Sequence, residues 1–407
     1  MNLITLAFRN VFRHRHRTAV TTLAMAFACA MMIVFAALMD GFSIGSERNV
    51  VSMNTGDIQI HMPGYRDEPN IYSLINNADQ LLEQFREKEF YASKRLFAFG
   101  LMASDLGSSG VQLRGVDLVY EPTVTEIDEH IMTGDWINSV DQHGVVIGKR
   151  LSKLLDVGLG DELIFVGQTA DGYMANDSFK VKGILKSVSP TIDNAGVFMS
   201  NVMLSELIAL PEGAHELVLM RIDRTGDLTL KTTRLRTSLG SGLEVMNWQQ
   251  LMPIINRFLE TAHIQTLIMM IFTYIAVASV VLNAMLMSVF ERVHEFGIMK
   301  AIGVKPKKLV LLIYTEMFIQ TFLAALIAIL TGCSLSWYFQ EKGLDMSSLA
   351  EEISFAGIAF DPIWYAALTV NSILIPVLFL FVVAAIAVIY PAAKVAIISP
   401  VDAIHHQ

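Results

Sequence analysis

The residues best suited to do chemistry lie in one short charged segment, residues 291–308, which reads ERVHEFGIMKAIGVKPKK. Glu291 and Glu295 are four positions apart, so on a single helix they would share one face. Paired carboxylates of this kind can meet a basic surface on another protein. Gly297 and Gly303 can turn the chain back, because glycine adopts backbone angles that other residues avoid. An ordinary charged loop explains the same residues equally well.

No pattern for nucleotide hydrolysis or metal binding occurs in the sequence. The nearest phosphate-loop match is GVVIGKR at Gly144–Arg150. Three residues separate its glycines where four are needed, and Arg150 stands where Ser or Thr would hold magnesium. We interpret it as a strand that ends in a glycine turn. We expect no catalytic residue, no metal site and no resident cofactor, and we do not expect an enzyme.

Four long apolar runs must position the charged segment. They are Thr18–Met39, Ile264–Phe290, Leu309–Gln340 and Pro362–Ala393. The whole chain is 53% hydrophobic and only 17% charged, whereas about a quarter of the residues in a soluble domain are charged. Each run is long enough to cross the hydrocarbon core, which takes about 20 apolar residues. The sequence therefore predicts four transmembrane helices.

Glu316 is the one charged residue inside these runs. It lies eight positions after Lys308, which is about 12 Å along a helix. An ionisable residue within a span is a functional candidate. Contact with a neighbouring helix would satisfy the same carboxylate, so a structural role stays open beside the functional one.

The Lys and Arg residues flanking the runs predict the orientation, because they concentrate on the cytoplasmic side. Residues 1–17 carry four arginines and no acid, and residues 291–308 carry five bases. Residues 341–361 carry one base against five acids. We expect both termini and residues 291–308 in the cytoplasm, and residues 40–263 outside. Residues 1–17 should form an amphipathic helix along the membrane surface.

The predicted outer segment, residues 40–263, is acidic and folds without a disulfide. It holds 30 Asp and Glu against 19 Lys and Arg, which argues against nucleic acid as a partner. Both cysteines, Cys29 and Cys333, lie in the apolar runs. Strand-like alternation occurs at Asp57–Met62, Val111–Val116, Phe179–Leu185 and Glu216–Ile222, and helical patterns at Asn77–Glu89, Lys149–Leu155 and Leu228–Leu239. This predicts an α+β domain, with a helical stalk at Trp248–His263 leading into the second span.

Three motifs resemble those of the FtsX/MacB superfamily of transporter permeases. The charged segment resembles the coupling segment of the family through Glu291, Arg292, Glu295, Gly297, Lys300, Ala301 and Gly303. The head is similar to the N-terminal signature of the family through Arg9, Asn10, Arg13, Arg17 and Thr18. The tail is similar to its C-terminal signature through Pro391, Ala392, Ala396, Pro400 and Ala403. The motifs occur in the order of the family and cover the whole chain.

Within the superfamily the outer segment looks most like LolC/LolE, the lipoprotein-releasing permeases. In that family a protruding loop grips a periplasmic carrier. The matching stretch here is Gly167–Asp177, with Gly167, Tyr173, Met174 and Asp177 as candidate contacts. It departs from the family because it is short and has no proline or basic residue. The third span is often glycine-rich in the family, and here it retains only Gly332.

The resemblance implies a permease subunit of an ABC transporter in the bacterial inner membrane. Two copies of a cytoplasmic ATPase would bind ATP and magnesium, and a second permease copy or paralogue would complete a dimer in the lipid bilayer. ATP-driven motion would then pass through the spans to release an amphiphilic substrate. Lipoprotein release is favoured. The alternatives are a tripartite efflux permease with a periplasmic adaptor, and a signal transmitter to a cell-wall hydrolase.

The expected layout is therefore a membrane protein with four transmembrane helices and a large periplasmic α+β domain between spans one and two. The segments are a cytoplasmic helix (1–17), span one (18–39), the periplasmic domain with its stalk (40–263), span two (264–290), the coupling segment (291–308), span three (309–339), a periplasmic loop (340–364), span four (365–390) and a cytoplasmic tail (391–407).

Overall fold

The computed structural model forms two compact units. The helical unit comprises Met1–Gly45, Leu259–Leu349 and Ile363–Gln407, and the sheet unit comprises Ser46–Phe258 and Ala350–Pro362. The residues that the structure describes are 3–13, 15–87, 89–138, 141, 143–210, 212–223, 226–345, 353–355, 358–360 and 363–397. The predicted tail residues Pro400 and Ala403 lie outside them.

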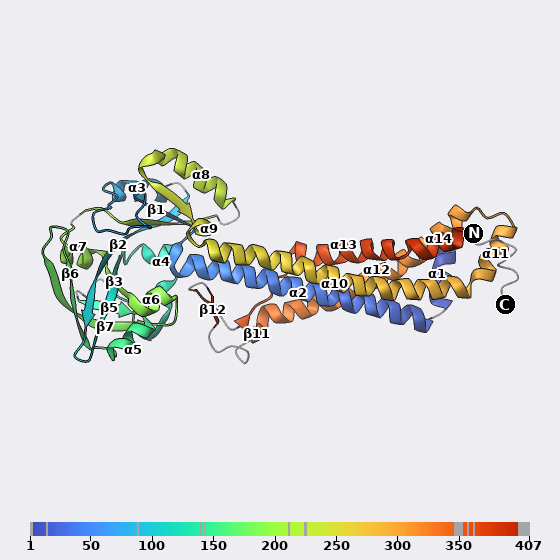
Figure 1. Ribbon diagram of the computed structural model, residues 1–407, viewed down its shortest axis with the longest axis horizontal. Helices are drawn as coiled ribbons and strands as arrows, with labels where there is room; N and C mark the ends of the chain where they lie inside the picture. Colours follow the sequence, from blue (N-terminus) through green and yellow to red (C-terminus); the bar gives the residue numbers. More distant parts are fainter. Residues whose placement is uncertain are drawn as a thin grey trace. The chain divides into compact units, whose positions relative to one another are not determined.

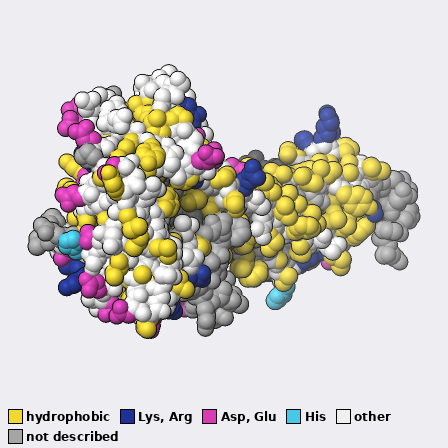
Figure 2. Space-filling model, turned by 60° about the vertical axis from the view of Figure 1, so that its left-hand side comes forward, with side chains coloured by type: hydrophobic (Ala, Val, Ile, Leu, Met, Phe, Trp, Pro, Cys, Tyr) yellow, Lys and Arg dark blue, Asp and Glu magenta, His cyan; other side chains and the backbone are white. Residues whose placement is uncertain are grey.

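Long apolar helices build the helical unit (Figure 1). Its elements are α1 (Leu3–Arg13), α2 (Arg15–Val50), α10 (Pro253–Glu291), α11 (Val293–Ala301), α12 (Pro306–Lys342), α13 (Val370–Ala387), α14 (Ile389–Ile397) and the short strands β11 (Leu344–Asp345) and β14 (Ile363–Trp364). Four described helical stretches are long and apolar enough to cross a membrane: Arg15–Thr55, Pro253–Glu291, Pro306–Lys342 and Val370–Ile397. Hydrophobic side chains cover most of the visible face of this unit in Figure 2.

Close backbone contact holds the helices of this unit together. A Cβ atom at Gly332 of α12 would lie 3.2 Å from the carbonyl oxygen of Ala30 and 3.1 Å from Cβ of Ile33, both on α2. A side chain at this position would require Ala30 or Ile33 to move by a few tenths of an ångström, so glycine favours the close approach of the two helices. The buried Tyr274 hydroxyl of α10 donates a hydrogen bond to the carbonyl oxygen of Pro376 in α13, at 2.6 Å. Small residues and an interhelical hydrogen bond are typical of helix packing in lipid.

A ten-stranded mixed sheet forms the centre of the other unit (Figure 1). Its strands are β1 (Ile58–His61), β2 (Phe90–Ala103), β3 (Ser108–Val116), β4 (Ile131–Gly134), β5 (Gly144–Ile147), β6 (Glu162–Gln168), β7 (Met174–Leu185), β8 (Gly196–Ser200), β9 (Glu216–Arg221) and β10 (Glu244–Asn247). The order is β10-β1-β9-β2-β3-β8-β5-β7-β4, and β6 pairs with β2 and β7. The pairs β3–β8 and β5–β7 are parallel and the others antiparallel.

Short helices connect and cover these strands. They are α3 (Ala78–Arg86), α4 (Glu121–Val124), α5 (Lys149–Leu155), α6 (Pro190–Ala195), α7 (Asn201–Leu207), α8 (Leu228–Leu239) and α9 (Trp248–Leu251), with single turns at Val51–Thr55, Ile127–Glu129 and Gly240–Gly242. A separate hairpin pairs β12 (Ile353–Phe355) with β13 (Ile358–Phe360). The predicted α+β class is confirmed for this unit, as are the four predicted strands and three predicted helices.

Two local predictions differ from the structure. Gly148 follows β5 with extended angles (φ −67°, ψ 149°) and precedes α5, so the predicted glycine turn is wrong. A side chain there would meet the carbonyl oxygen of Ile192 at 2.2 Å, so the glycine is needed for a close approach. The predicted stalk helix is interrupted, because α9 ends before Met252 and α10 starts at Pro253. Proline cannot donate the amide hydrogen bond that an unbroken helix requires at this position.

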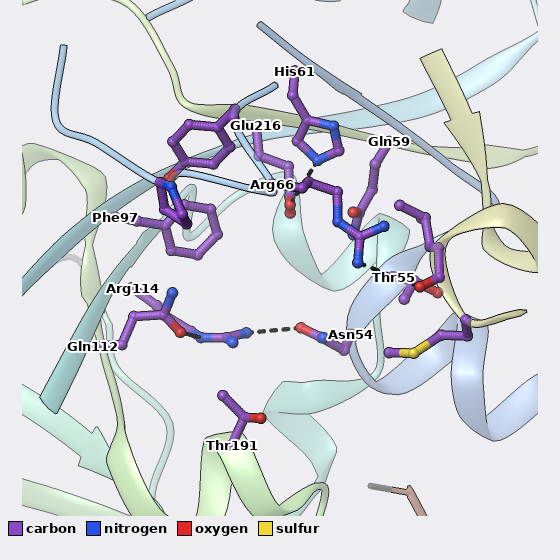
Figure 3. A pocket seen from close by; sticks show the side chains of 14 residues that line it. Asn54, Thr55, Gln59, His61, Arg66, Phe97, Gln112, Arg114, Thr191 and Glu216 are labelled. Atoms are coloured by element: carbon purple, nitrogen blue, oxygen red, sulfur yellow. Dashed lines mark hydrogen bonds and ion pairs between the residues drawn. The ribbon is translucent and has the colours of Figure 1, made fainter. Parts of the chain in front are cut away.

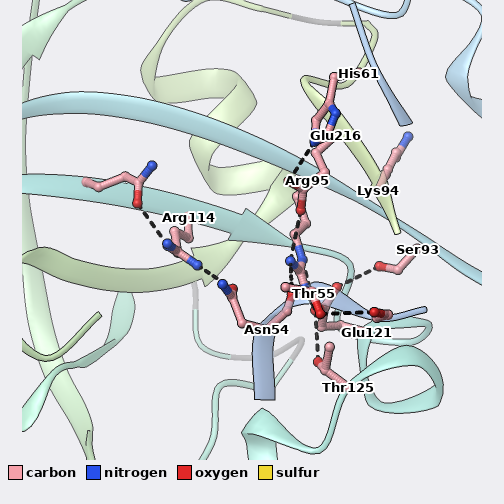
Figure 4. A network of polar contacts seen from close by, with 12 residues as sticks. Asn54, Thr55, His61, Ser93, Lys94, Arg95, Arg114, Glu121, Thr125 and Glu216 are labelled. Carbon is pink, nitrogen blue, oxygen red and sulfur yellow. Dashed lines mark hydrogen bonds and ion pairs between the residues drawn. The ribbon is translucent and has the colours of Figure 1, made fainter. Parts of the chain in front are cut away.

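Buried ion pairs tie the sheet together around Arg95 of β2 (Figure 4). The guanidinium of Arg95 lies 2.5 Å from Glu121 Oε1 and 2.9 Å from Glu216 Oε1. His61 Nε2 lies 3.3 Å from the second oxygen of Glu216. Burial opposes ionisation of Glu216, but the hydrogen bond from His61 and the charge of Arg95 outweigh it and lower the pKa of Glu216 to about 2. Removing one partner of such a group strands a buried charge, which is strongly destabilising.

His215 is fixed in its neutral form by two backbone bonds. Its Nδ1 accepts from the amide of Phe97 at 3.0 Å, and its Nε2 donates to the carbonyl oxygen of Ile71 at 3.1 Å. Protonation of Nδ1 would place a ring proton against the Phe97 amide proton, and Nδ1 could then no longer accept that hydrogen bond. Burial accordingly lowers the pKa of His215 below its ordinary value.

We predict that acid destabilises the sheet unit in two steps. His215 and Glu216 have lowered pKa values when folded, so the unfolded state binds more protons, and the stability decreases as the pH is lowered. The His215 contribution is lost as the pH falls below 6.5, and that of Glu216 as it falls from 4.5 toward 2. The melting temperature of the full chain in non-ionic detergent, followed by tryptophan fluorescence, should fall between pH 7.5 and 5.

The variant His215→Gln should melt lower than wild type but with a flatter pH dependence in that range. The matched control is His143→Gln, because the side chain of His143 is 59% exposed. The melting temperature of this control should depend on pH as steeply as that of the wild type. Equal slopes for wild type and His215→Gln would remove His215 as the cause.

Candidate functional site

The predicted coupling segment forms a helix, α11, between two sharp changes of direction. The first is Arg292, whose angles (φ −113°, ψ 15°) separate the end of α10 at Glu291 from the start of α11. The second is Gly303, which has φ +91° and precedes α12. Pro306 then occupies the first turn of α12, where a missing amide proton costs nothing.

Two geometric predictions for this segment are wrong. Glu291 ends α10 whereas Glu295 lies in the first turn of α11, so the two carboxylates do not share one helical face. Gly297 lies inside α11 and is buried, so of the two glycines only Gly303 turns the chain. A spacing of four positions places two residues on one face only within one continuous helix, and the chain is broken at Arg292.

Arg292 and Glu316 form a buried ion pair. Nη1 of Arg292 donates to both carboxylate oxygens of Glu316, at 2.9 and 3.0 Å, and the two side chains are 7% and 6% exposed. The amide nitrogen of Asn10 in α1 donates to the same carboxylate at 2.7 Å. The acid within the third apolar run is thus satisfied by two other segments of the chain.

Arginines of the head bind the other two carboxylates of the segment. Arg17 Nη1 lies 2.6 Å from Glu291 Oε2, and Arg13 Nη1 lies 2.7 Å from Glu295 Oε1. Arg292 adds a second bond to Glu295, at 3.1 Å. Burial alone would raise the pKa of Glu295, but the hydrogen bonds from Arg292 and Arg13 hold it below the ordinary value.

These contacts define a charged junction that joins α1, α2, α10, α11 and α12. Its members are Asn10, Arg13, Arg17, Glu291, Arg292, Glu295 and Glu316. Three guanidinium groups face three carboxylates, so the junction is neutral as a whole. The carboxylates that were expected to meet a partner already hold arginines of this chain, while Glu291 and Glu295 keep 35% and 40% of their side chains exposed.

Lys300 attaches α11 to the last described helix. Its Nζ donates to the carbonyl oxygen of Ala396 in α14 at 2.9 Å, and burial lowers the pKa of this amine. The structure thus brings Glu291, Arg292 and Glu295 together with Glu316, and connects Lys300 to a different helix.

Sequence reasoning missed the contribution of Asn10, Arg13 and Arg17. The available signal was the predicted location of residues 1–17 and 291–308 on one side of the membrane.

The predicted partner loop of the sheet unit is a hairpin between β6 and β7. Tyr173 and Met174 stand at its tip and are 73% and 76% exposed. Asp177 lies within β7, with a carboxylate oxygen 3.8 Å from Nδ1 of His143. Gly167 lies in β6, where a side chain would meet the ring of Phe165 at 2.5 Å. The structure thus leaves Tyr173 and Met174 accessible at the end of the hairpin.

No cluster of three metal-binding side chains occurs among the described residues. Cys29 is buried and Cys333 partly buried, and neither forms a disulfide. The charged junction connects five helices through ion pairs and hydrogen bonds.

Comparison with known proteins gives two family matches. Residues 18–232 match the MacB-like periplasmic core domain, and residues 267–400 match the FtsX-like permease C-terminal region. An uncharacterized ABC transporter permease of Methanocaldococcus jannaschii is 20% identical over 427 aligned positions, covering 100% of this chain and 98% of the relative.

Two solved structures are similar to part of the chain. The periplasmic region of MacB from Actinobacillus actinomycetemcomitans is 16% identical, with a TM-score of 0.37, and the match covers 51% of this chain and 94% of that structure. The extracellular domain of the ABC-type transporter YknZ from Gram-positive bacteria is 12% identical, with a TM-score of 0.34, and the match covers 48% of this chain and 100% of that structure.

We predict that Glu316→Met destabilises the helical unit by roughly 3–5 kcal/mol, because it leaves the buried guanidinium of Arg292 without a carboxylate. The double variant Arg292→Met with Glu316→Met removes both charges and should recover much of this loss. Unfolding of the detergent-solubilised chain by increasing amounts of SDS measures the difference. A single variant as stable as wild type would show that the ion pair contributes nothing.

Proposed function

We infer, because this chain belongs to the family of the MacB-like periplasmic core domain, that it is the permease subunit of an ABC transporter. The core-domain match covers more than half of the chain. The FtsX-like permease match covers residues 267–400, which contain α11, α12 and α13. Together with the four long apolar helices, these matches make the chain a membrane protein of the FtsX/MacB type.

A permease of this family works with a separate ATPase. The chain has no phosphate-binding loop, so we propose that ATP and magnesium bind only to that partner. We further propose two ATPase copies and a second permease copy or paralogue, with both termini of this chain in the cytoplasm of a bacterial cell and residues 40–263 in the periplasm. The Lys and Arg bias at three flanks supports this orientation.

The charged junction supports α11 as the element that receives force from the ATPase. Separating Arg292 from Glu316 would strand two buried charges, at a cost of roughly 3–5 kcal/mol. A displacement of α11 therefore moves α12 and the head helix with it, because breaking the pair is the costlier alternative. Lys300 extends the same connection to α14. We propose that the residues that couple the permease to the ATPase are Glu291, Arg292, Glu295, Gly297, Lys300 and Gly303.

The proposed cargo is an amphiphilic molecule handled on the periplasmic side, and lipoprotein release is the favoured role. The exposed Tyr173 and Met174 at the β6–β7 hairpin tip support contact there with a carrier or adaptor. The alternatives are tripartite efflux and signalling to a cell-wall hydrolase. Neighbouring genes separate the three roles: a second permease favours lipoprotein release, an adaptor favours efflux, and a hydrolase favours signalling.

We predict that the two units of the chain differ in their accessibility to an impermeant thiol reagent. In a background with Cys29 and Cys333 replaced by alanine, Ser238→Cys should react in intact spheroplasts. Lys305→Cys should react only after lysis. Both positions are exposed, so reactivity reports the side of the membrane. The opposite labelling pattern would overturn the orientation.

A charge swap separates the internal role of Glu291 from its role toward the ATPase. Arg17→Glu alone and Glu291→Arg alone should each lower the melting temperature, because like charges then face each other. The double variant restores the pair with reversed signs and should melt near wild type. If Glu291 also meets the ATPase, the double variant should bind the partner at least ten-fold more weakly, about 1.4 kcal/mol.

The measurement is ATPase co-purification together with cargo-stimulated ATP hydrolysis. The control is the double variant Arg48→Glu with Glu126→Arg, which reverses an exposed ion pair of the sheet unit. This variant should leave ATPase co-purification and cargo-stimulated ATP hydrolysis unchanged. Normal coupling in the Arg17→Glu, Glu291→Arg variant would restrict Glu291 to its internal role.

A further inference from the structure

A pocket of about 340 Å³ opens in the sheet unit beside the buried ion pairs. This volume is at the lower end of the range for small-molecule sites, about 300–1,000 Å³. Polar side chains from β1, β3 and the turn after β1 line one part of it, and Phe97, Leu251 and Met252 line another. Figure 3 shows the guanidinium groups of Arg114 and Arg66 reaching into this space from different sides.

Arg114 differs from the other two buried arginines of the sheet. Arg95 and Arg221 each bind a carboxylate directly, Arg95 that of Glu121 at 2.5 Å and Arg221 that of Asp57 at 3.1 Å. Arg114 is equally buried, with 8% of its surface exposed. Among the described residues no carboxylate lies within ion-pair distance of it.

Arg114 bonds to amide oxygens instead. Its Nη1 donates to Oδ1 of Asn54 at 2.8 Å, and its Nε donates to Oε1 of Gln112 at 3.0 Å. Within the described part of the chain its Nη2 has no acceptor. Burial, and then the nearby charge of Arg95, lower the pKa of Arg114 to about 10. An anion in the pocket would offset both effects.

Two further polar side chains of the pocket, Gln59 and Tyr65, present polar atoms that remain accessible. Gln59 and Tyr65 are each only 6% exposed, yet neither side chain has a hydrogen-bond partner among the residues that the structure describes. The polar atoms of both side chains are therefore free to bond to a molecule in the pocket. Burial, and then the charge of Glu216, raise the pKa of Tyr65, so its hydroxyl stays protonated and can donate.

Arg66 adds a second positive charge from the exposed side. Its Nη2 donates to the carbonyl oxygen of Leu251 at 3.3 Å, and the described residues provide it with no ion-pair partner. The one acid of the pocket, Glu216, is already held by Arg95 and His61. The pocket thus offers unpaired donors and a net positive charge, and lacks a free negative group.

We propose that this pocket binds a small organic anion. Its carboxylate or phosphate group pairs with Arg114 and Arg66 and accepts from Tyr65 or Gln59, and its apolar part packs against Phe97 and Met252. A cation is excluded by the two guanidinium groups, and a neutral apolar ligand would leave the buried donors unpaired. The proposal does not depend on the permease role, and its failure would leave that role unaffected.

Cysteine protection tests the site directly in the full chain. Thr191 is exposed at the pocket, so Thr191→Cys, in a background with Cys29 and Cys333 replaced by alanine, reports on its occupancy. The probe is octanoate, with octanol as the uncharged molecule of the same apolar length. Octanoate should slow modification of this cysteine at least five-fold in non-ionic detergent, and octanol should have no effect.

The matched variants are Arg66→Gln and Arg236→Gln. Both arginines are exposed and bond to a backbone carbonyl oxygen, but Arg236 lies outside the pocket. Arg66→Gln should abolish protection, and Arg236→Gln should retain it. Equal protection by octanol, protection that survives Arg66→Gln, or no protection by octanoate in the parent would each overturn the proposal.

Discussion

The helical unit depends on how a charge is accommodated among apolar helices. Glu316 stands in a run of more than thirty residues with no other charge, and burial of an unpaired carboxylate there would be prohibitive. Arg292 supplies the counter-charge and Asn10 a further donor. To deliver them, α10 has to end at Glu291 and the head helix has to pack against α12. The ion pair therefore dictates the path of the chain around it.

The sheet unit also contains buried charges, and here most of the buried arginines are paired with carboxylates from other segments. Arg95 binds carboxylates from α4 and β9, and Arg221 binds that of Asp57, which directly precedes β1. These pairs act across the sheet and help to select one strand order, since a different register would separate them. Arg114 is the exception, because amides contact it on two sides and its remaining donor faces a cavity. Arg114 is thus the buried arginine of the sheet for which the described part of the chain provides no carboxylate.

Local patterns predicted much of this architecture. The four apolar runs, the strands β1, β3, β7 and β9, and the helix α5 follow from alternation or helical periodicity, which neighbouring residues determine. The candidate site was found only in part. Arg17 and Glu291 are 274 positions apart, and nothing in a periodic pattern pairs them. The break at Arg292 was missed because its partner Glu316 is 24 positions away, and a local pattern does not reveal such a pair. The order of the strands was likewise out of reach, since it depends on packing between distant segments.

The contact at Gly332 has a consequence for how related sequences diverge. The space that a side chain would need there is filled by Ile33 and the backbone of Ala30 on α2. Alanine at position 332 would require Ile33 or the backbone of Ala30 to shift by a few tenths of an ångström, and a smaller residue at position 33 would relieve part of that contact. Sizes at positions 332 and 33 should therefore covary among homologues, with a larger residue at one matched by a smaller residue at the other.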